Sequence, residues 1–86
     1  MKLIKGLIGN IDMARTVHYN IIYLLKGDEA TTYEMAKACK KFEKWFKSET
    51  GTTVHLTYYL DDFLTDIWHI EFSSKLGCGV VVLLDD

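Results

Sequence analysis

The hydrophobic pattern of the chain changes its period at Gly51, and this change restricts the chain to folds that contain both helix and strand. Before Gly51, apolar side chains recur at spacings of four, three and four residues, namely at Met35, Cys39, Phe42 and Phe46. This spacing predicts an amphipathic helix over residues 32–50. Beyond Gly51, apolar and polar residues alternate along residues 54–60, which indicates a strand with one buried face.

Both ends of the predicted helix carry recognisable signals. Thr31 can cap the N-terminus, and Glu34, three positions later, completes a capping box. Gly51 follows the last turn, where a left-handed residue commonly ends a helix. We therefore expect the helix to begin directly after Thr31 and to end before Gly51.

Three strands are predicted after the helix. Residues 54–60 and 67–72 both alternate, and the aspartate-rich link at residues 61–66 favours an antiparallel hairpin between them. The β-branched segment 80–84 favours a third strand. If residues 79–84 lie at an edge of the sheet, they can pair with a second copy, so both a monomer and a homodimer remain open.

The residues before the helix are predicted to form two further strands. Apolar residues alternate from Val17 to Leu25, which predicts a long strand over residues 17–25. Residues 2–8 fit a short amphipathic helix as well as a strand. We favour a strand, because a loop centred on residues 10–12 can return the chain as a hairpin and because so short a helix is marginal.

Together these elements predict an α+β fold with the order β-β-α-β-β-β. One amphipathic helix would pack on one face of a mainly antiparallel, five-stranded sheet, and the other face would remain exposed. A chain of 86 residues is expected to form one compact domain over residues 1–86.

Composition is typical of a soluble globular protein, with 49% hydrophobic and 26% charged residues. No apolar run approaches the roughly 20 residues that a membrane helix needs, so a membrane partner is not expected. Lys5 interrupts the apolar start of the chain, and no signal-peptide cleavage site follows it. Cys39 and Cys78 are too few to staple a secreted domain, so we expect reduced thiols and a cytoplasmic location.

Three histidines, His18, His55 and His69, occupy the polar positions of their predicted strands. If these strands are neighbours, the three imidazoles project from the exposed sheet face, where they could bind zinc. Their spacing contains neither H-x-H nor H-x-x-x-H, so ordinary surface histidines are the favoured interpretation. Neither a metal nor another cofactor is expected.

The exposed sheet face and the loop beside it carry the residues that we expect to bind a partner. Tyr59 lies at a polar strand position and Phe63 lies in the aspartate-rich loop, so each can anchor a protein interface. The loop carboxylates, together with Asp85 and Asp86, favour a cationic partner surface. The predicted partner-binding residues are His55, Tyr59, Asp61, Asp62, Phe63, Asp66, His69 and Glu71.

A second group of candidate residues is the lysine-rich face of the predicted helix. Its members are Lys37, Lys40, Lys41, Lys44 and Lys47. Such a face can follow a nucleic-acid backbone, although the net charge of -2 and the scarcity of arginine favour a simple solvated face. A nucleic-acid-binding module is therefore the alternative function.

No catalytic signature is present in the sequence. Ser73 and Ser74 lack a nucleophile elbow, and the glycines around Cys78 are not followed by the predicted helix that a phosphate-binding loop requires. An enzyme is thus the least expected class. We expect instead a small interaction protein that binds and blocks a partner protein.

The short chain without proline combines the opening MKLIKGLIGN, the lysine-rich segment KACKKFEKWFK and the loop LDDFLTD. In its size and in this layout the chain resembles the small phage-encoded anti-CRISPR and anti-defence inhibitor proteins. This resemblance implies an α+β inhibitor that works in the host cytoplasm. Such an inhibitor blocks a nuclease or another nucleic-acid-binding complex by direct contact.

Overall fold

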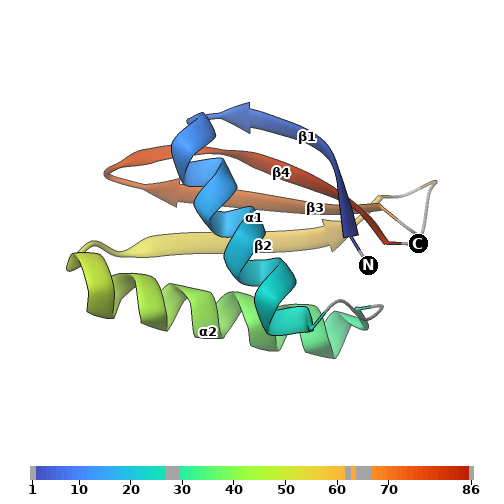
Figure 1. Cartoon of the computed structure of the whole chain (residues 1–86), viewed down its shortest axis with the longest axis horizontal. Coiled ribbons are helices and arrows are strands. Elements are labelled where there is room, and N and C mark those ends of the chain that lie inside the picture. Colours follow the sequence, from blue (N-terminus) through green and yellow to red (C-terminus); the bar gives the residue numbers. More distant parts are fainter. Residues whose placement is uncertain (1, 27–29, 62, 64–66, 86) are drawn as a thin grey trace.

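The structure of the protein, a computed structural model, describes residues 2–26, 30–61, 63 and 67–85. Within these residues the elements follow one another in the order β1 (Lys2–Gly9), α1 (Ile11–Leu25), α2 (Thr32–Thr50), β2 (Val54–Leu60), β3 (Ile67–Ser74) and β4 (Gly77–Asp85) (Figure 1). The strands form one sheet in the order β1-β4-β3-β2, and all neighbouring strands are antiparallel.

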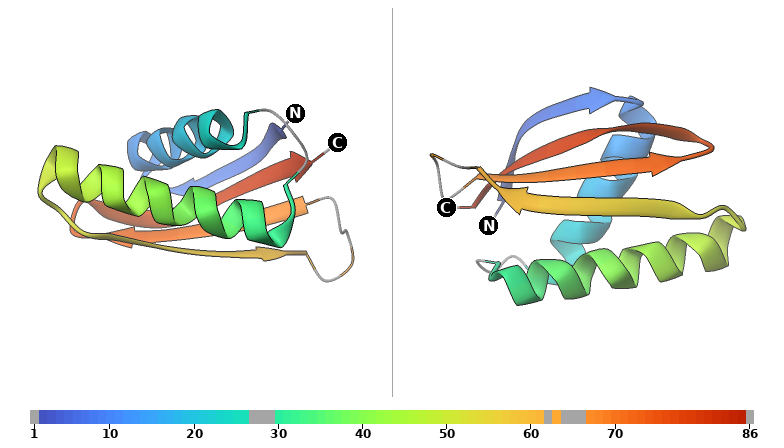
Figure 2. Two further views of the ribbon diagram at one scale, coloured as in Figure 1. Left: turned by 90° about the horizontal axis from the view of Figure 1, so that it is seen from below. Right: turned by 180° about the vertical axis from the view of Figure 1, so that it is seen from behind.

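Both helices lie on the same face of the sheet, so the molecule has two layers (Figures 1 and 2). Buried side chains of α1 and α2 meet those of β2, β3 and β4 in one apolar cluster between the layers. Neither helix covers the opposite face of the sheet. The predicted α+β class with an antiparallel sheet is confirmed. Among the described residues, no helix is both long and apolar enough to cross a membrane.

The predicted strand over residues 17–25 is wrong, because these residues belong to α1. Val17 and Ile21 are buried, whereas Tyr19 and Tyr23 are 69% and 81% exposed. In an alternating segment, every second apolar residue lies four positions from the next, which is close to the 3.6 residues of one helical turn. The same pattern therefore fits a strand and one stripe of a helix. The described residues therefore form four strands and two helices, not five strands and one helix.

Asn10 starts α1 instead of forming the predicted loop over residues 10–12. Its Oδ1 accepts a hydrogen bond from the backbone N–H of Met13 at 3.0 Å, and its Nδ2 donates to the carbonyl of Leu76 at 3.1 Å. Asparagine is a preferred N-cap because its oxygen satisfies an unpaired N–H of the first helical turn. The same side chain thus fixes the helix start against the turn between β3 and β4.

The strand predicted over residues 2–8 is confirmed as β1, but its predicted partner is wrong. β1 pairs with β4, for example Ile8 with Val80. β4 consequently lies inside the sheet, so residues 79–84 are not the free edge that was predicted for a homodimer. Gly79 permits this pairing, because a Cβ at that position would collide with the carbonyl oxygen of Ile8.

The helix α2 and the β2–β3 hairpin form as predicted. Thr31 and Glu34 close the capping box, with an N–H···O distance of 3.1 Å in each direction. Gly51 ends α2 in the left-handed conformation, at a φ of 73°. In the hairpin, Thr57 of β2 pairs with Glu71 of β3.

Candidate functional site

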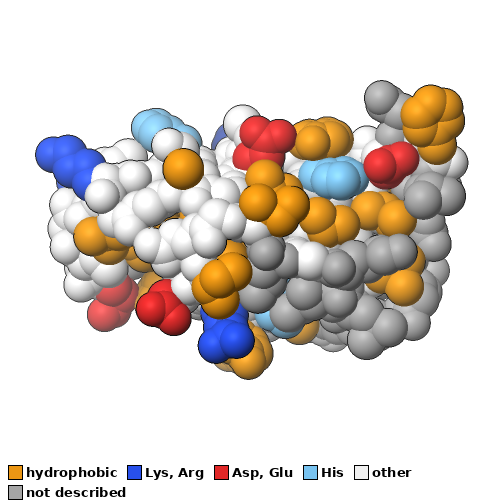
Figure 3. Space-filling view, turned by 90° about the horizontal axis from the view of Figure 1, so that it is seen from above, with side chains coloured by type: hydrophobic (Ala, Val, Ile, Leu, Met, Phe, Trp, Pro, Cys, Tyr) orange, Lys and Arg blue, Asp and Glu red, His pale blue; other side chains and the backbone are white. Residues whose placement is uncertain are grey.

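The sheet face turned away from the helices is the candidate site, and we call it the open face. Its described side chains come from all of the strands: Ile8 of β1; His55, Thr57 and Tyr59 of β2; Ile67, His69, Glu71 and Ser73 of β3; Cys78, Val80, Val82 and Leu84 of β4. The register aligns them in rows across the strands, such as Tyr59, His69 and Val82. Figure 3 views the molecule over the β1 edge. Along its upper margin, to the right of a basic side chain at the left end, hydrophobic side chains alternate with histidine and acidic side chains.

Three side chains gather at the end of the open face where the β2–β3 hairpin turns, and we call them the Tyr59 cluster. The rings of Tyr59 and His69 stack at a centroid distance of 4.9 Å and an interplanar angle of 7°. His69 Nε2 lies 3.2 Å from Asp61 Oδ2, so the imidazole can donate a hydrogen bond to the carboxylate. His69 is therefore held by two partners, and it supports the ring of Tyr59, which is 47% exposed.

Asp61 also shapes the start of the loop that follows β2. Its Oδ1 accepts a hydrogen bond from the backbone N–H of Phe63 at 2.9 Å, and its own N–H donates to the carbonyl of Ile67 at 2.9 Å. Such local bonds are typical of aspartate in turns. One carboxylate thus links the loop to His69, and the side chain of Phe63 is 92% exposed beside it.

A shallow hollow of about 400 Å³ occupies the other end of the open face. Among the residues that line it are His55 and Thr57 of β2, Glu71 of β3, and Cys78 and Val80 of β4. Its wall therefore mixes a carboxylate, an imidazole and a thiol with apolar side chains. In the described part of the chain, no group of three histidine, cysteine or acidic side chains is placed to hold a metal ion.

The predicted grouping of three histidines is wrong, because His18 lies on the helix side of the sheet. It belongs to α1 and is 9% exposed, and neither ring nitrogen has a hydrogen-bond partner among the described residues. Burial lowers the pKa of His18, so its ring is neutral at neutral pH. His55 and His69 lie on the open face as predicted, in different rows.

The other predicted partner-binding residues that the structure describes lie on or beside the open face. The Tyr59 cluster contains three of them, and Glu71 and His55 border the hollow. Asp62 and Asp66 lie outside the described residues. The sequence pattern thus placed side chains on one face, and the hairpin register brought Asp61 against His69.

Val80 and Val82 are apolar residues of the open face that the sequence analysis did not assign to it. Both belong to an unbroken apolar run in β4, and both are half-buried. A run without polar residues does not distinguish one strand face from the other. Only the pairing of β4 with β3 assigns Val80 and Val82 to the side of Glu71 and His69.

The lysines of α2 form a second exposed surface, which we call the lysine stripe: Lys37, Lys40, Lys41, Lys44 and Lys47. Glu43, the one acidic residue within this segment of the sequence, turns toward β2. Its Oε2 accepts a hydrogen bond from the backbone N–H of Leu56 at 2.8 Å. The carboxylate of Glu43 is therefore committed to the sheet edge.

A scan against protein-family models finds no match for this chain. Searches of curated proteins and of solved structures find no match either. The case for a function therefore depends on the geometry of the open face and of the lysine stripe.

Proposed function

We propose that this protein is a small non-catalytic interaction protein that binds and blocks a partner protein through the open face. The observation that carries the proposal is the Tyr59 cluster on a sheet face that neither helix covers. An aromatic side chain held in place before binding loses little conformational freedom when a partner covers it. Tyrosine is also among the residues that contribute most to affinity at protein interfaces.

The charge of the open face favours a partner with basic groups. Asp61 and Glu71 place carboxylates at this face, whereas the lysine stripe belongs to the helix layer. Apolar contacts with Ile8 and Val80 would supply buried area, and the carboxylates would orient the partner and exclude acidic surfaces. The loop residues Asp62, Phe63 and Asp66 belong to the same proposed contact surface.

The same charge and the resemblance of the chain to anti-defence inhibitors support one class of partner. Nucleases and other nucleic-acid-binding complexes carry basic surfaces, because they must neutralise phosphate groups. An inhibitor of the anti-CRISPR or anti-defence kind, acting in the host cytoplasm, would cover such a surface. The open face supports this proposal through its carboxylates and its exposed ring.

Capture experiments with matched variants test the proposal. The tagged protein is used to capture its partner from an extract of its native cells, and the captured partner is identified. Tyr59→Ala and Phe63→Ala are expected to lose it, because each removes an exposed ring from the same end of the open face. Tyr23→Ala is the matched control, since it removes another exposed ring, that of α1 in the other layer.

Phe63→Ala and Tyr23→Ala remove largely exposed side chains, so each is expected to change the free energy of unfolding by about 0.5 kcal/mol or less. Tyr59→Ala also removes the stacking on His69, so it is expected to cost up to about 1 kcal/mol. A loss of capture by a variant that is still folded at the assay temperature therefore reports on the contact surface. Full capture by the Tyr59→Ala, Phe63→Ala double variant would refute the proposal. So would a loss of capture that is equal for Tyr23→Ala.

The lysine stripe supports a second candidate function, the binding of nucleic acid. The favouring observation is that the Glu43 carboxylate is bonded to the edge of β2. Glu43 therefore does not place its negative charge among the exposed ammonium groups of the stripe. Fluorescence anisotropy with labelled single-stranded and double-stranded oligonucleotides measures binding at low salt. Lys40→Glu plus Lys44→Glu is expected to abolish it, and added salt is expected to weaken it steeply. Binding that survives this charge reversal would rule the stripe out.

A further inference from the structure

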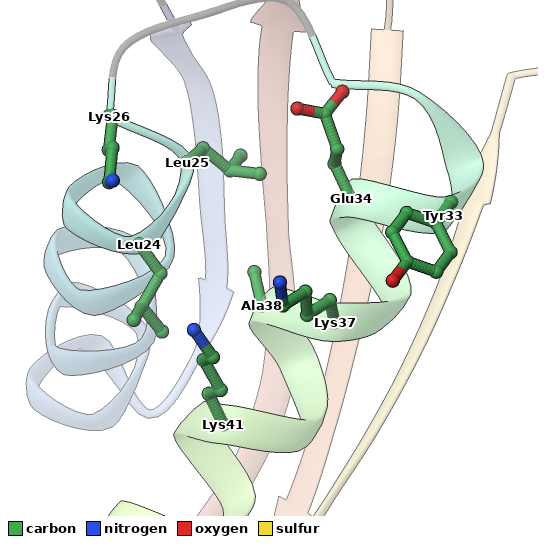
Figure 4. Close-up of a pocket in the computed structure, with 8 residues that line it drawn as sticks. All are labelled: Leu24, Leu25, Lys26, Tyr33, Glu34, Lys37, Ala38 and Lys41. Carbon is green, nitrogen blue, oxygen red and sulfur yellow. The ribbon is translucent and has the colours of Figure 1, made fainter.

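A notch of about 310 Å³ lies between the C-terminal end of α1 and the N-terminal half of α2, and we call it the lysine notch. It is lined by Leu24, Leu25, Lys26, Tyr33, Glu34, Lys37, Ala38 and Lys41 (Figure 4). Its volume is at the lower end of the range of small-molecule pockets. None of the lining residues belongs to the open face.

The floor of the notch is apolar. Leu25 and Ala38 are buried where the two helices meet, and Leu24 is half-buried beside them. Tyr33 contributes a largely exposed ring on the α2 side. Apolar surface and an aromatic ring together favour a flat apolar group, which can stack on the ring and leave water.

Ammonium groups border this apolar floor. In Figure 4 the nitrogen atoms of Lys37 and Lys41 point into the space between the helices, and Lys26 borders that space at the end of α1. Lys37 and Lys41 are four residues apart, so they lie on the same face of α2. An anion that binds among these groups is attracted by all of them, and it also relieves the repulsion between their like charges.

The backbone brings Lys26 to the notch in an unusual conformation. Its φ is 57°, and no other non-glycine residue in the described part of the chain has a positive φ. Its N–H donates a hydrogen bond to the carbonyl of Tyr23 at 3.2 Å. Glycine suits a left-handed helix end better, so backbone conformation alone does not favour a lysine at this position.

The carboxylate that lines the notch is engaged at the start of α2. Glu34 Oε1 accepts a hydrogen bond from the backbone N–H of Thr31 at 3.1 Å. In Figure 4 this carboxylate lies at the end of the notch opposite Lys41. The lining residues therefore present three ammonium groups against one carboxylate, an excess of positive charge.

We propose that the lysine notch binds a nucleoside monophosphate, with its phosphate among Lys26, Lys37 and Lys41 and its base on Tyr33. Lysine binds phosphate as a point charge through charge-assisted hydrogen bonds. A phosphate monoester carries about two negative charges at neutral pH, which matches the excess of ammonium groups. The site holds one phosphate group, and it depends neither on the open face nor on a strand bound along the lysine stripe.

Titration of the isotope-labelled protein with three probes tests the proposal, with amide chemical shifts as the readout. Adenosine monophosphate is expected to shift the amides of Leu24 and Ala38 and to saturate. Inorganic phosphate, which lacks the base, and adenosine, which lacks the phosphate, are each expected to bind at least about tenfold more weakly. Equal affinity for adenosine and adenosine monophosphate would overturn the proposal, and so would the absence of shifts at the notch.

Double variants of two lysine pairs on α2 distinguish binding in the notch from binding to the general positive charge of the helix. Lys37→Ala plus Lys41→Ala is expected to weaken the binding of adenosine monophosphate by about tenfold or more. Lys40→Ala plus Lys44→Ala removes the same charge outside the notch, and is expected to weaken it by less than about twofold. Equal weakening by both pairs would overturn the proposal.

A last variant tests the place of the base. Tyr33→Leu removes an exposed ring and should leave the fold intact. It is expected to weaken the binding of adenosine monophosphate by about threefold to tenfold, because stacking on an aromatic ring contributes to affinity. The binding of inorganic phosphate should not change. An equal loss for both probes would place the base elsewhere and contradict the proposed arrangement.

Discussion

The contact between Glu43 of α2 and the edge strand β2 gives a sharp test of how this sheet is stabilised. Glu43 Oε2 accepts a hydrogen bond from the backbone N–H of Leu56 at 2.8 Å, in a part-buried setting. β2 is an edge of the sheet, so this N–H has no neighbouring strand on its outer side. The substitution Glu43→Ala removes the acceptor and leaves a part-buried donor without a protein partner.

The size of the effect follows from the burial of the two groups. A hydrogen bond to a charged group contributes about 1.5–3 kcal/mol. Because Glu43 is only half-buried, water replaces part of the loss, and we expect Glu43→Ala to lower the free energy of unfolding by about 1–2 kcal/mol. Each kcal/mol corresponds to about 4–8 °C of melting temperature in a domain of this size. Glu43→Gln keeps a neutral acceptor and should lose roughly half as much.

Urea unfolding followed by tryptophan fluorescence measures these differences. Glu49→Ala is the matched control, because Glu49 is an exposed acid on the same helix, and it is expected to stay within about 0.5 kcal/mol of the original protein. The freed N–H also makes β2 a better template for another strand, so Glu43→Ala should associate at high concentration in sedimentation velocity. If Glu43→Ala is as stable as Glu49→Ala, the contact does not stabilise the sheet edge and the reasoning is wrong.

Three further predictions concern groups inside the fold. His18→Phe is expected to raise the free energy of unfolding by about 1 kcal/mol, because it replaces a buried ring whose nitrogens lack partners among the described residues. Since burial lowers the pKa of His18 from 6.5, its contribution to stability is present above about pH 6.5 and is lost as the pH falls through the lower folded-state pKa. His18→Phe should therefore lose less stability on acidification, and thermal melts with the same pH dependence as the original protein would contradict this. Burial, with a smaller contribution from Glu43, raises the pKa of Cys39 to about 12, so iodoacetamide should modify the exposed Cys78 and spare Cys39 in the native protein. Two adducts in the mass spectrum of native protein would disagree with this. Gly79→Ala is expected to destabilise by about 1–3 kcal/mol, because its Cβ would collide with a carbonyl of β1, and an unchanged urea midpoint would argue against that close approach.

The elements that the sequence predicted correctly are those with short-range signals. The capping box of Thr31 and Glu34 and the left-handed Gly51 lie within a few residues of the helix ends that they mark. The alternation of β2 and β3 likewise needs only neighbouring residues, and it placed Tyr59 and His69 on the exposed side. Such patterns reflect backbone conformation and amphipathicity, which depend on nearby positions.

The α1 segment is the clearest case in which local pattern was insufficient. Tyr19 and Tyr23 look like inward strand residues when the segment is read alone, because tyrosine counts as apolar. In the structure they point outward, and Val17 and Ile21 pack into the core. Burial against the sheet and α2 decided between two periods that the sequence satisfies equally.

The sequence by itself determined the helix α2, the β2–β3 hairpin and the exposed side of its residues, because these depend on residues close together in the chain. Only the tertiary structure placed β4 between β1 and β3, turned Glu43 to the edge of β2 and closed the lysine notch between two helices. Each of these arrangements joins segments that are distant in sequence. They form only when the whole chain buries its apolar faces together, and no local pattern records which distant segments will meet.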